Sequence, residues 1–339
     1  MGNRRFPGPT LREVCSPLID EDLAPLVPEH TTVQISSRLT DDEFQRLADF
    51  MADHPDVRLR VYGGYDESIT DLDFLRFFPR LRRFSVDAIY ELPSMDGIGL
   101  LSDELEDLLI GWTRSKRFSL RNLAKFRRLR TLYLEWQQKE IEAIGELQAL
   151  EDLTLRSITL PDLSALVPLR NLTSLDIKLG GTHDVALLPR IGQLTYVELW
   201  RIRGLADVSA LAEVESLEHF FLQTLRGITS LPSFAGSRNL RFVALDTMKG
   251  ITDLAPLADA PNLELLRLIQ MCHLEPEALR PFIGHPTLKD GTWGLCSDRK
   301  NIAAWDLLPL GDPPFNRPKS TAPNRFRQPR QARDEGSAG

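Results

Sequence analysis

The stretch 150–155 reads Leu-Glu-Asp-Leu-Thr-Leu, and the stretch 172–177 reads Leu-Thr-Ser-Leu-Asp-Ile. The same pattern, Leu-x-x-Leu-x-Leu or a close apolar variant, recurs at intervals of 21 to 25 residues between Asp56 and Leu288. A period of this length indicates a protein built from stacked copies of one short structural unit. The cleanest copies begin at Leu129, Leu150, Leu172, Leu194, Leu217, Leu240 and Leu263.

The last two apolar residues of each copy lie two positions apart, as Leu153 and Leu155 do. In a strand, residues two apart point to one side, and the residue between them points to the other. Each copy therefore predicts one short strand, and neighbouring copies can bury their apolar faces only by stacking side by side. We expect the leucines to form one buried column, with the residues between them, such as Thr154 and Asp176, facing outward.

The segments that return the chain to the next strand share a second pattern. Each begins with Asp, followed by an apolar residue and, in most copies, a small residue. Such a sequence favours the N-cap of a very short helical turn, and so short a repeat leaves room for little more. These aspartates are Asp71, Asp162, Asp207 and Asp253.

On these patterns the chain resembles the leucine-rich repeat proteins. The Ile-Thr-Asp-Leu sequences at 69–72 and 251–254 are similar to those of the short-repeat type, which includes bacterial internalins and a regulatory subunit of protein phosphatase one. The resemblance covers residues 56 to 295. It implies an α/β solenoid, a leucine-rich repeat fold with a curved parallel β-sheet and short helices or 3-10 turns on the convex side.

One position departs from that family. The family places Asn at the corner after each strand, where its side chain ties neighbouring coils together. This chain has mostly apolar residues there, which predicts apolar packing at the corner instead of an asparagine ladder. The residues are Ile89, Thr113, Gln137, Ile158, Gly180, Ile202, Leu225, Met248 and Met271.

We expect one elongated domain with capped ends. Residues 1–30 form an irregular N-terminal segment, and residues 31–310 form the leucine-rich repeat solenoid. Within the solenoid, residues 31–55 are an N-terminal cap, in which the sequence Thr-Asp-Asp-Glu at 40–43 predicts a capping box. Residues from about 276 to 310 are a C-terminal cap. Residues 311–339 are rich in Pro, Arg, Ser and Gly, which predicts a disordered tail.

The composition excludes several kinds of partner. The chain has 339 residues, of which 42% are hydrophobic and 26% charged, and its net charge is −7. Binding to duplex nucleic acid generally needs a basic surface, so we expect no nucleic-acid partner. No apolar run approaches the roughly 18 residues that a membrane-spanning helix needs, so we expect no membrane segment.

The N-terminus and the cysteines both favour the cytoplasm. No apolar run of signal-peptide length follows the arginines at positions 4 and 5. Cys15, Cys272 and Cys296 are odd in number and show no close pair spacing, which is typical of reduced thiols. Secreted members of the family often carry cysteine-paired caps, and the sequence shows no such pattern. We therefore expect a cytoplasmic protein with free thiols.

The sequence contains no common catalytic motif. It has no phosphate-binding loop, dinucleotide-binding glycine motif, zinc-protease motif or Cys-x-x-Cys pair. The glycine pairs at 63–64 and 180–181 follow predicted strands directly, which favours tight turns over phosphate loops. The repeated aspartates lack the glycine-rich frame of a calcium ladder. We therefore expect no enzyme activity, no cofactor and no metal.

The outward positions of the predicted strands carry large aromatic residues where a solvated strand would carry Ser, Thr or Lys. Exposed aromatic residues flanked by charge are typical of protein interfaces. Lateral packing between strands is the alternative reason for such rings. The predicted partner-binding residues are Tyr133, Trp136, Tyr196, Glu198, Trp200, His219, Phe221, Phe242 and Arg267.

We interpret the chain as a monomeric, non-enzymatic scaffold that binds a protein partner on its concave sheet face. The family resemblance is compatible with a bacterial adaptor and with a toxin-neutralising immunity protein, and nothing in the residues separates the two. Two alternatives belong to other classes. One is a structural protein that assembles with itself through the aromatic residues, and the other is an enzyme with its active site in residues 1–110.

Overall fold

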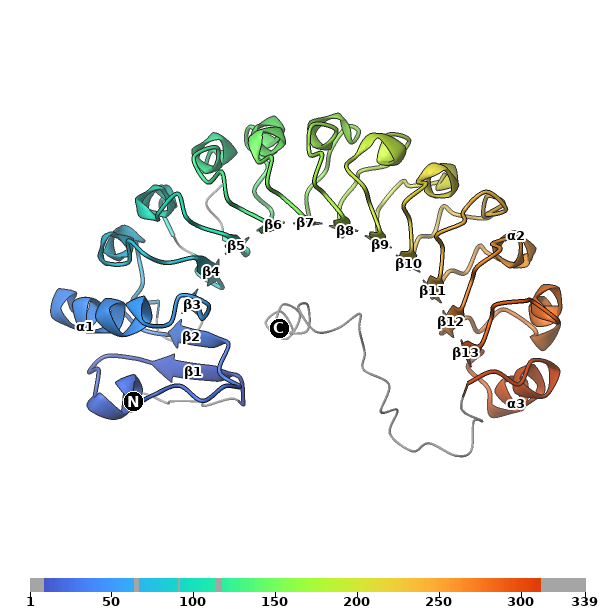
Figure 1. The fold of residues 1–339 in the computed structure, drawn as a ribbon, viewed down its shortest axis with the longest axis horizontal. Coiled ribbons are helices and arrows are strands. Elements are labelled where there is room, and N and C mark those ends of the chain that lie inside the picture. Colours follow the sequence, from blue (N-terminus) through green and yellow to red (C-terminus); the bar gives the residue numbers. More distant parts are fainter. Residues whose placement is uncertain (1–8, 64–66, 91, 114–117, 312–339) are drawn as a thin grey trace.

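The computed structural model describes residues 9–63, 67–90, 92–113 and 118–311. Its central feature is one parallel sheet of 13 strands, in which each strand pairs with the next strand along the chain. The sheet is curved: the strands line the inside of an arc, and the helical segments lie on its outside (Figure 1). The predicted curved solenoid is confirmed. Except for Gly311, the predicted tail lies outside the described residues.

Each strand contains only four or five residues. The strands are β1 (Leu11–Val14), β2 (Thr32–Ile35), β3 (Arg58–Tyr62), β4 (Arg83–Asp87), β5 (Asp107–Ile110), β6 (Thr131–Glu135), β7 (Asp152–Arg156), β8 (Ser174–Lys178), β9 (Tyr196–Trp200), β10 (His219–Gln223), β11 (Phe242–Asp246), β12 (Leu265–Ile269) and β13 (Asp290–Trp293).

The return segments are short, as the repeat length predicted, and most are 3-10 turns. The 3-10 segments are η1 (Asp20–Leu23), η2 (Asp73–Phe77), η3 (Asp96–Leu100), η4 (Leu120–Leu123), η5 (Ile141–Glu146), η6 (Ser164–Leu166), η7 (Leu188–Arg190), η8 (Ser209–Glu213) and η9 (Pro276–Phe282). The α-helices are α1 (Asp41–Ala52), α2 (Ala255–Ala258) and α3 (Asp298–Leu307).

The strands pair in the register that the repeat predicts. Leu153 of β7 lies opposite Leu175 of β8, which lies opposite Val197 of β9, and all three are fully buried. Thr154 and Asp176 lie on the other face, as expected, but they are only 2% and 0% exposed. Side chains on the inside of an arc converge, and the Thr154 hydroxyl also donates a hydrogen bond to the Asp176 carboxylate at 3.4 Å.

The corner after each strand has a regular backbone conformation. Trp136, Ser157, Leu179 and Arg201 each follow a strand and have positive φ values of 65°, 54°, 56° and 48°. In this conformation the N–H of Trp136 donates to the carbonyl of the last residue of β7 at 3.1 Å, and its counterparts make the same bond one coil further on. The corner therefore bonds each coil to the next through a repeated backbone hydrogen bond.

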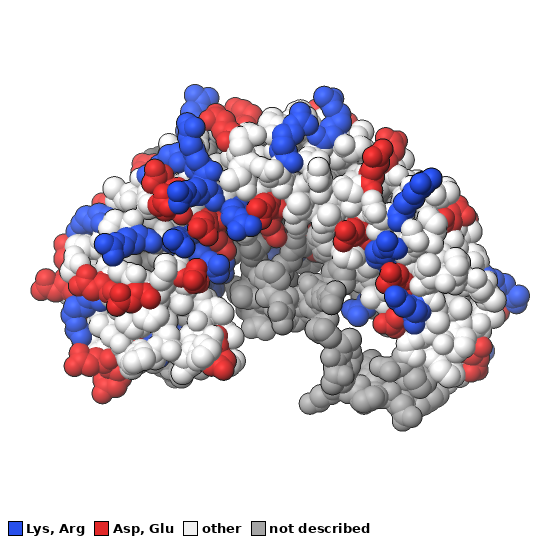
Figure 2. All heavy atoms as spheres, in the orientation of Figure 1, with Lys and Arg blue, Asp and Glu red and all other residues white. Residues whose placement is uncertain are grey.

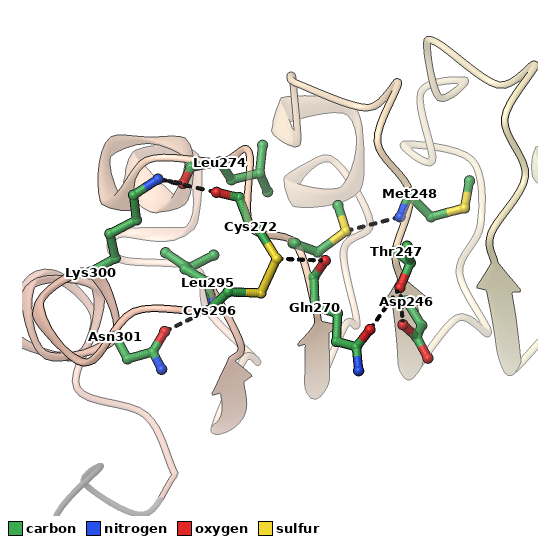
Figure 3. Close-up of a disulfide and its surroundings, with 11 residues drawn as sticks. Asp246, Thr247, Met248, Gln270, Cys272, Leu274, Leu295, Cys296, Lys300 and Asn301 are labelled. Carbon is green, nitrogen blue, oxygen red and sulfur yellow. Dashed lines mark hydrogen bonds between the residues drawn. A yellow bond between two sulfur atoms is a disulfide. The ribbon is translucent and has the colours of Figure 1, made fainter.

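The positions that carry Asn in the family are buried, which confirms the predicted apolar packing at this corner. Two methionines also act as acceptors there. The buried N–H of Leu225 lies 3.5 Å from the Met248 sulfur. The N–H of Met248 in turn lies 3.3 Å from the Met271 sulfur (Figure 3). A thioether is a weak acceptor. It nevertheless gives a buried donor a partner at a site where Ile or Leu would give none.

Asparagines bond neighbouring coils to each other at the opposite end of the strands, just before each strand begins. Asn171, Asn239 and Asn262 each donate a side-chain N–H to a backbone carbonyl of the preceding coil, at 2.8 to 2.9 Å. Three coils therefore carry an inter-coil amide bond at the end of the strands opposite to the position of Asn in the family.

The repeated aspartates start the return segments in a slightly different way from the one expected. The carboxylates of Asp162, Asp207 and Asp253 each accept a hydrogen bond from the N–H two residues further on, at 2.7 to 2.9 Å. This is the geometry of an Asx-turn. The aspartate lies one residue before the N-cap, so it bends the chain into the turn instead of capping it.

The N-terminal cap begins earlier than the sequence indicated. The predicted capping box is present, because the Thr40 and Glu43 side chains bond to each other's backbone N–H groups at the start of α1. Residues 1–30, however, are not all irregular. The strand β1 lies within them and pairs with β2, and its Val14 is fully buried. The pattern did not predict this strand because it is four residues long and has no complete leucine repeat.

The C-terminal cap corrects the expectation of free thiols. Cys272 and Cys296 form a disulfide, with Cα atoms 4.9 Å apart, between the corner after β12 and the start of α3 (Figure 3). Their separation of 24 residues is one repeat, and the solenoid therefore brings them side by side. The adjacent Lys300 ammonium donates to the carbonyls of Cys272 and Leu274, and Asn301 accepts from the Leu295 N–H.

We predict that Leu175→Ala destabilises the protein by about 2 to 5 kcal/mol, because it leaves a cavity inside the leucine column. Urea unfolding of the purified protein measures this change. The control is Arg170→Ala, a truncation of an exposed residue in the same coil, which should change stability by less than about 0.5 kcal/mol. Equal costs for the two variants would contradict a continuous core at this coil.

Candidate functional site

The structure brings together seven of the nine predicted partner-binding residues on four neighbouring strands. They come from β9, β10, β11 and β12, which pair consecutively, and all face the inside of the arc. Tyr133 and Trp136 lie apart from them, on β6 and at the corner that follows it. We refer to the five rings on β9 to β11 as the aromatic patch: Tyr196, Trp200, His219, Phe221 and Phe242.

The aromatic patch is partly accessible and its rings contact one another. Tyr196, Trp200, His219 and Phe221 are half-buried, while Phe242 is only 6% exposed. The His219 and Phe242 rings meet edge to face with centroids 6.1 Å apart. Both interpretations of these rings are therefore visible in the structure: the patch packs laterally and also presents ring surface to the concave side.

Two cations from β7 and β8 lie near Trp200. The Arg156 guanidinium and the Lys178 ammonium each lie 5.8 Å from the centre of a Trp200 ring. Lys178 is also paired with the carboxylates of Asp176 at 3.7 Å and Glu198 at 3.2 Å. This end of the patch thus has two cations near one ring, and carboxylates already partly neutralise both of them.

Glu198 has a different place from the one predicted. It is only 7% exposed, and its carboxylate accepts a hydrogen bond from the Tyr196 hydroxyl at 2.9 Å in addition to the ion pair with Lys178. A buried carboxylate with these partners holds Tyr196 and Lys178 in position. The structure therefore favours a positioning function for Glu198 over direct contact with a partner.

The β6 residues form a second, more polar region. Tyr133 is 5% exposed, and its hydroxyl donates a hydrogen bond to the Glu135 carboxylate at 3.2 Å. Burial, followed by the negative charge of Glu135, raises the pKa of the Tyr133 phenol above its usual range. Trp136 is 44% exposed and lines a shallow hollow with Lys139 and Arg203. Of the two, only Trp136 offers its ring to a partner.

Two residues of the site were missed by the sequence interpretation. Leu265 and Ile269 flank Arg267 on the concave side of β12, and both are half-buried. They extend the apolar surface of the aromatic patch by one strand. The signal was present in the sequence, because both occupy outward positions at which other coils carry polar residues.

Ion pairs between neighbouring strands occupy the other half of the concave face. Arg60 of β3 makes a bidentate pair with Asp87 of β4, at 2.9 and 3.0 Å. Arg156 of β7 is paired with Glu135 of β6 at 3.2 Å. On the side of the arc, which Figure 2 shows, Lys and Arg residues are interspersed with Asp and Glu residues.

The described part of the chain offers few features of other kinds of site. Within it, no group of three or more His, Cys, Asp or Glu residues is arranged to hold a metal ion. Among the same residues, no helix has the length and apolar composition to cross a membrane.

Comparison with known proteins identifies the fold. No family model and no curated protein matches the sequence. Among solved structures, an internalin, InlF of Listeria monocytogenes, is similar with a TM-score of 0.53 and 14% identity, over 84% of this chain and 78% of that one. A chain of the Toll–Spatzle complex of Drosophila is similar with a TM-score of 0.54 and 15% identity.

The second match covers 88% of this chain but only 46% of the other, so this chain spans less than half of that length. At these identities the likeness shows the fold alone. The solenoid is a leucine-rich repeat fold, as the sequence resemblance implied.

His219 gives the aromatic patch a measurable dependence on pH. Burial lowers the pKa of its imidazole below the usual value, and the nearby Glu218 acts weakly in the opposite direction. The unfolded chain, in which the pKa is about 6.5, therefore takes up a proton at a higher pH than the folded protein. The stability that depends on neutral His219 is fully present above the unfolded-state pKa of about 6.5. It is lost as the pH falls from there through the lowered folded-state pKa.

We predict that wild type loses more stability than His219→Gln between about pH 7.5 and about pH 5. Urea unfolding of both proteins at the two pH values isolates the contribution of this residue from that of the other titrating groups. If the difference between the two proteins is the same at both pH values, His219 is not desolvated in the folded protein.

Proposed function

We propose that the protein is a binding scaffold that holds a protein partner on the concave face of β9 to β12. The observation that carries this proposal is the aromatic patch, in which four half-buried rings on the adjacent strands β9 and β10 continue through Phe242 of β11 to Leu265 and Ile269 of β12. Clustered aromatic residues beside charged ones are the usual centre of a protein interface. A bacterial adaptor and a toxin-neutralising immunity protein are the two roles compatible with such a scaffold.

The fold supports the proposal by analogy. One similar structure is that of a complex, Toll with Spatzle, a molecular hub in Drosophila development and innate immunity. That statement concerns the other protein. It is nevertheless in accord with a solenoid whose curved sheet presents an extended surface to a second molecule.

We propose that the free protein is a monomer and not an enzyme. Self-assembly through the aromatic patch is the main rival, and light scattering after size exclusion distinguishes the two. A monomer mass with an intact patch supports the binding scaffold. A larger mass that reverts to monomer when the patch is mutated supports self-assembly instead.

We predict that the double variant Trp200→Ala, Phe221→Ala weakens capture of the native partner by at least tenfold, about 1.4 kcal/mol. The reason is that aromatic anchors contribute most of the binding energy of an interface. The measurement is affinity capture from the native cell, followed by titration of the captured partner. Folding should survive, because neither residue belongs to the leucine column.

The control for this experiment is Ile283→Ala, which truncates an exposed apolar residue at the end of η9, on the convex side. It should leave capture of the partner unchanged. If the patch variant unfolds while its folded fraction still binds normally, the rings serve lateral packing. The binding face is then to be sought around Trp136.

The disulfide is relevant to the cellular compartment in which the protein binds its partner. The cytoplasmic location was predicted from the sequence partly because the thiols were expected to be reduced. Disulfides, in contrast, persist mainly in oxidising compartments. We predict that a membrane-permeant maleimide added to intact cells leaves Cys272 and Cys296 unlabelled until a reductant is supplied. Mass spectrometry of the peptides reads out the labelling. Labelling of both cysteines before reduction would favour the cytoplasm.

A further inference from the structure

Arg267 occupies an unusual position for a charged residue on the concave face. It lies at the centre of β12, with Leu265 and Ile269 on the same face of its strand. The residues directly opposite it are Ala244 on β11 and Thr292 on β13. Its guanidinium carbon lies 5.6 Å from the centre of the Phe242 ring. The residues beside Arg267 on its strand and directly opposite it are thus apolar or small and neutral, and the aspartates of the two neighbouring strands, Asp246 and Asp290, are diagonal to it.

Arg267 also differs from other cations of this face in its partners. Arg60, Arg156 and Lys178 each have a carboxylate on an adjacent strand within 3.2 Å. Arg267 makes no ion pair with any residue that the structure describes. Its Nε is buried and has no hydrogen-bond partner in the same part of the chain. The stacking on Phe242 is the one interaction that engages its charge there.

This arrangement is costly in the free protein and becomes favourable with the right partner. A buried donor without an acceptor is unfavourable, because it has lost its bond to water and gained none in return. A guanidinium is a planar fork that bonds a carboxylate through two parallel N–H groups, and contact with an aromatic face fixes its plane in advance. The missing component of the Arg267 site is therefore an oxyanion that a partner brings.

We propose that the concave face of β9 to β12 binds a protein segment that presents an acidic side chain to Arg267 and apolar side chains to the aromatic patch. This inference rests on the proposed function and specifies the chemistry of the partner. Phe221 and Arg267 lie two strands apart, which corresponds to about 10 Å. Three residues of extended chain, or two turns of helix, span that distance in the partner.

A displayed library of random short peptides tests the proposal. Selection on wild type should enrich peptides that carry Asp or Glu near a cluster of aromatic or aliphatic residues. Selection on Arg267→Gln should retain the apolar residues and lose the enrichment of acids. The variant should fold, because the Arg267 side chain forms no ion pair with the described residues. The matched control is Arg280→Gln, on the convex side in η9, which should enrich the same peptides as wild type.

An enriched peptide then allows a double-mutant cycle. Replacing its acid by the corresponding amide should weaken binding to wild type by at least tenfold, about 1.4 kcal/mol. The same replacement should have little effect on binding to Arg267→Gln. Arg267→Lys should retain part of the acid preference, since it keeps the charge but loses the bidentate geometry.

The outcomes separate this inference from the function on which it rests. If wild type and Arg267→Gln enrich peptides of equal acid content, the inference is wrong and the binding scaffold stands. If wild type enriches nothing beyond what the Trp200→Ala, Phe221→Ala variant enriches, the proposed function is wrong, and the inference is wrong with it.

Discussion

The apolar face of each strand can leave water only against the strands of the neighbouring coils, and the rest of the structure depends on this constraint. It forces the coils into one parallel sheet with Leu153, Leu175 and Val197 in a continuous column. Strands stack about 4.8 Å apart, but a helical turn is wider than that. The sheet therefore bends with its turns on the outside (Figure 1), and the inner face remains for other uses.

The repeat made most of the fold predictable, because one coil explains all the others. It located the buried column, the return segments and the apolar corner. It did not reveal the left-handed backbone at Trp136, Ser157 and Arg201, since these are residue types that rarely adopt positive φ. The conformation is imposed by the bond from each corner N–H to the next coil, and that bond exists only once the coils are stacked.

The candidate site was predictable in position but not in pairing. The repeat period predicts which residues become neighbours. It does not predict which of several neighbours on the concave face a side chain bonds to. Glu198 therefore pairs with Lys178 and Tyr196 and is buried, although its position alone suggested an exposed contact. The disulfide was missed for the opposite reason. Cys272 and Cys296 looked distant in sequence, but their separation of 24 residues is one coil.

The division of the concave face determines where a partner gains free energy. Over β3 to β8, cations such as Arg60 and Arg156 already have carboxylates, and a partner that separated such a pair would leave a desolvated charge behind. Over β10 to β12 no such exchange is needed, because covering Phe221, Leu265 or Ile269 removes apolar surface from water without separating an ion pair among the described residues. Arg267 lies within this second region. A carboxylate placed there would therefore add a bond without breaking an ion pair among the described residues.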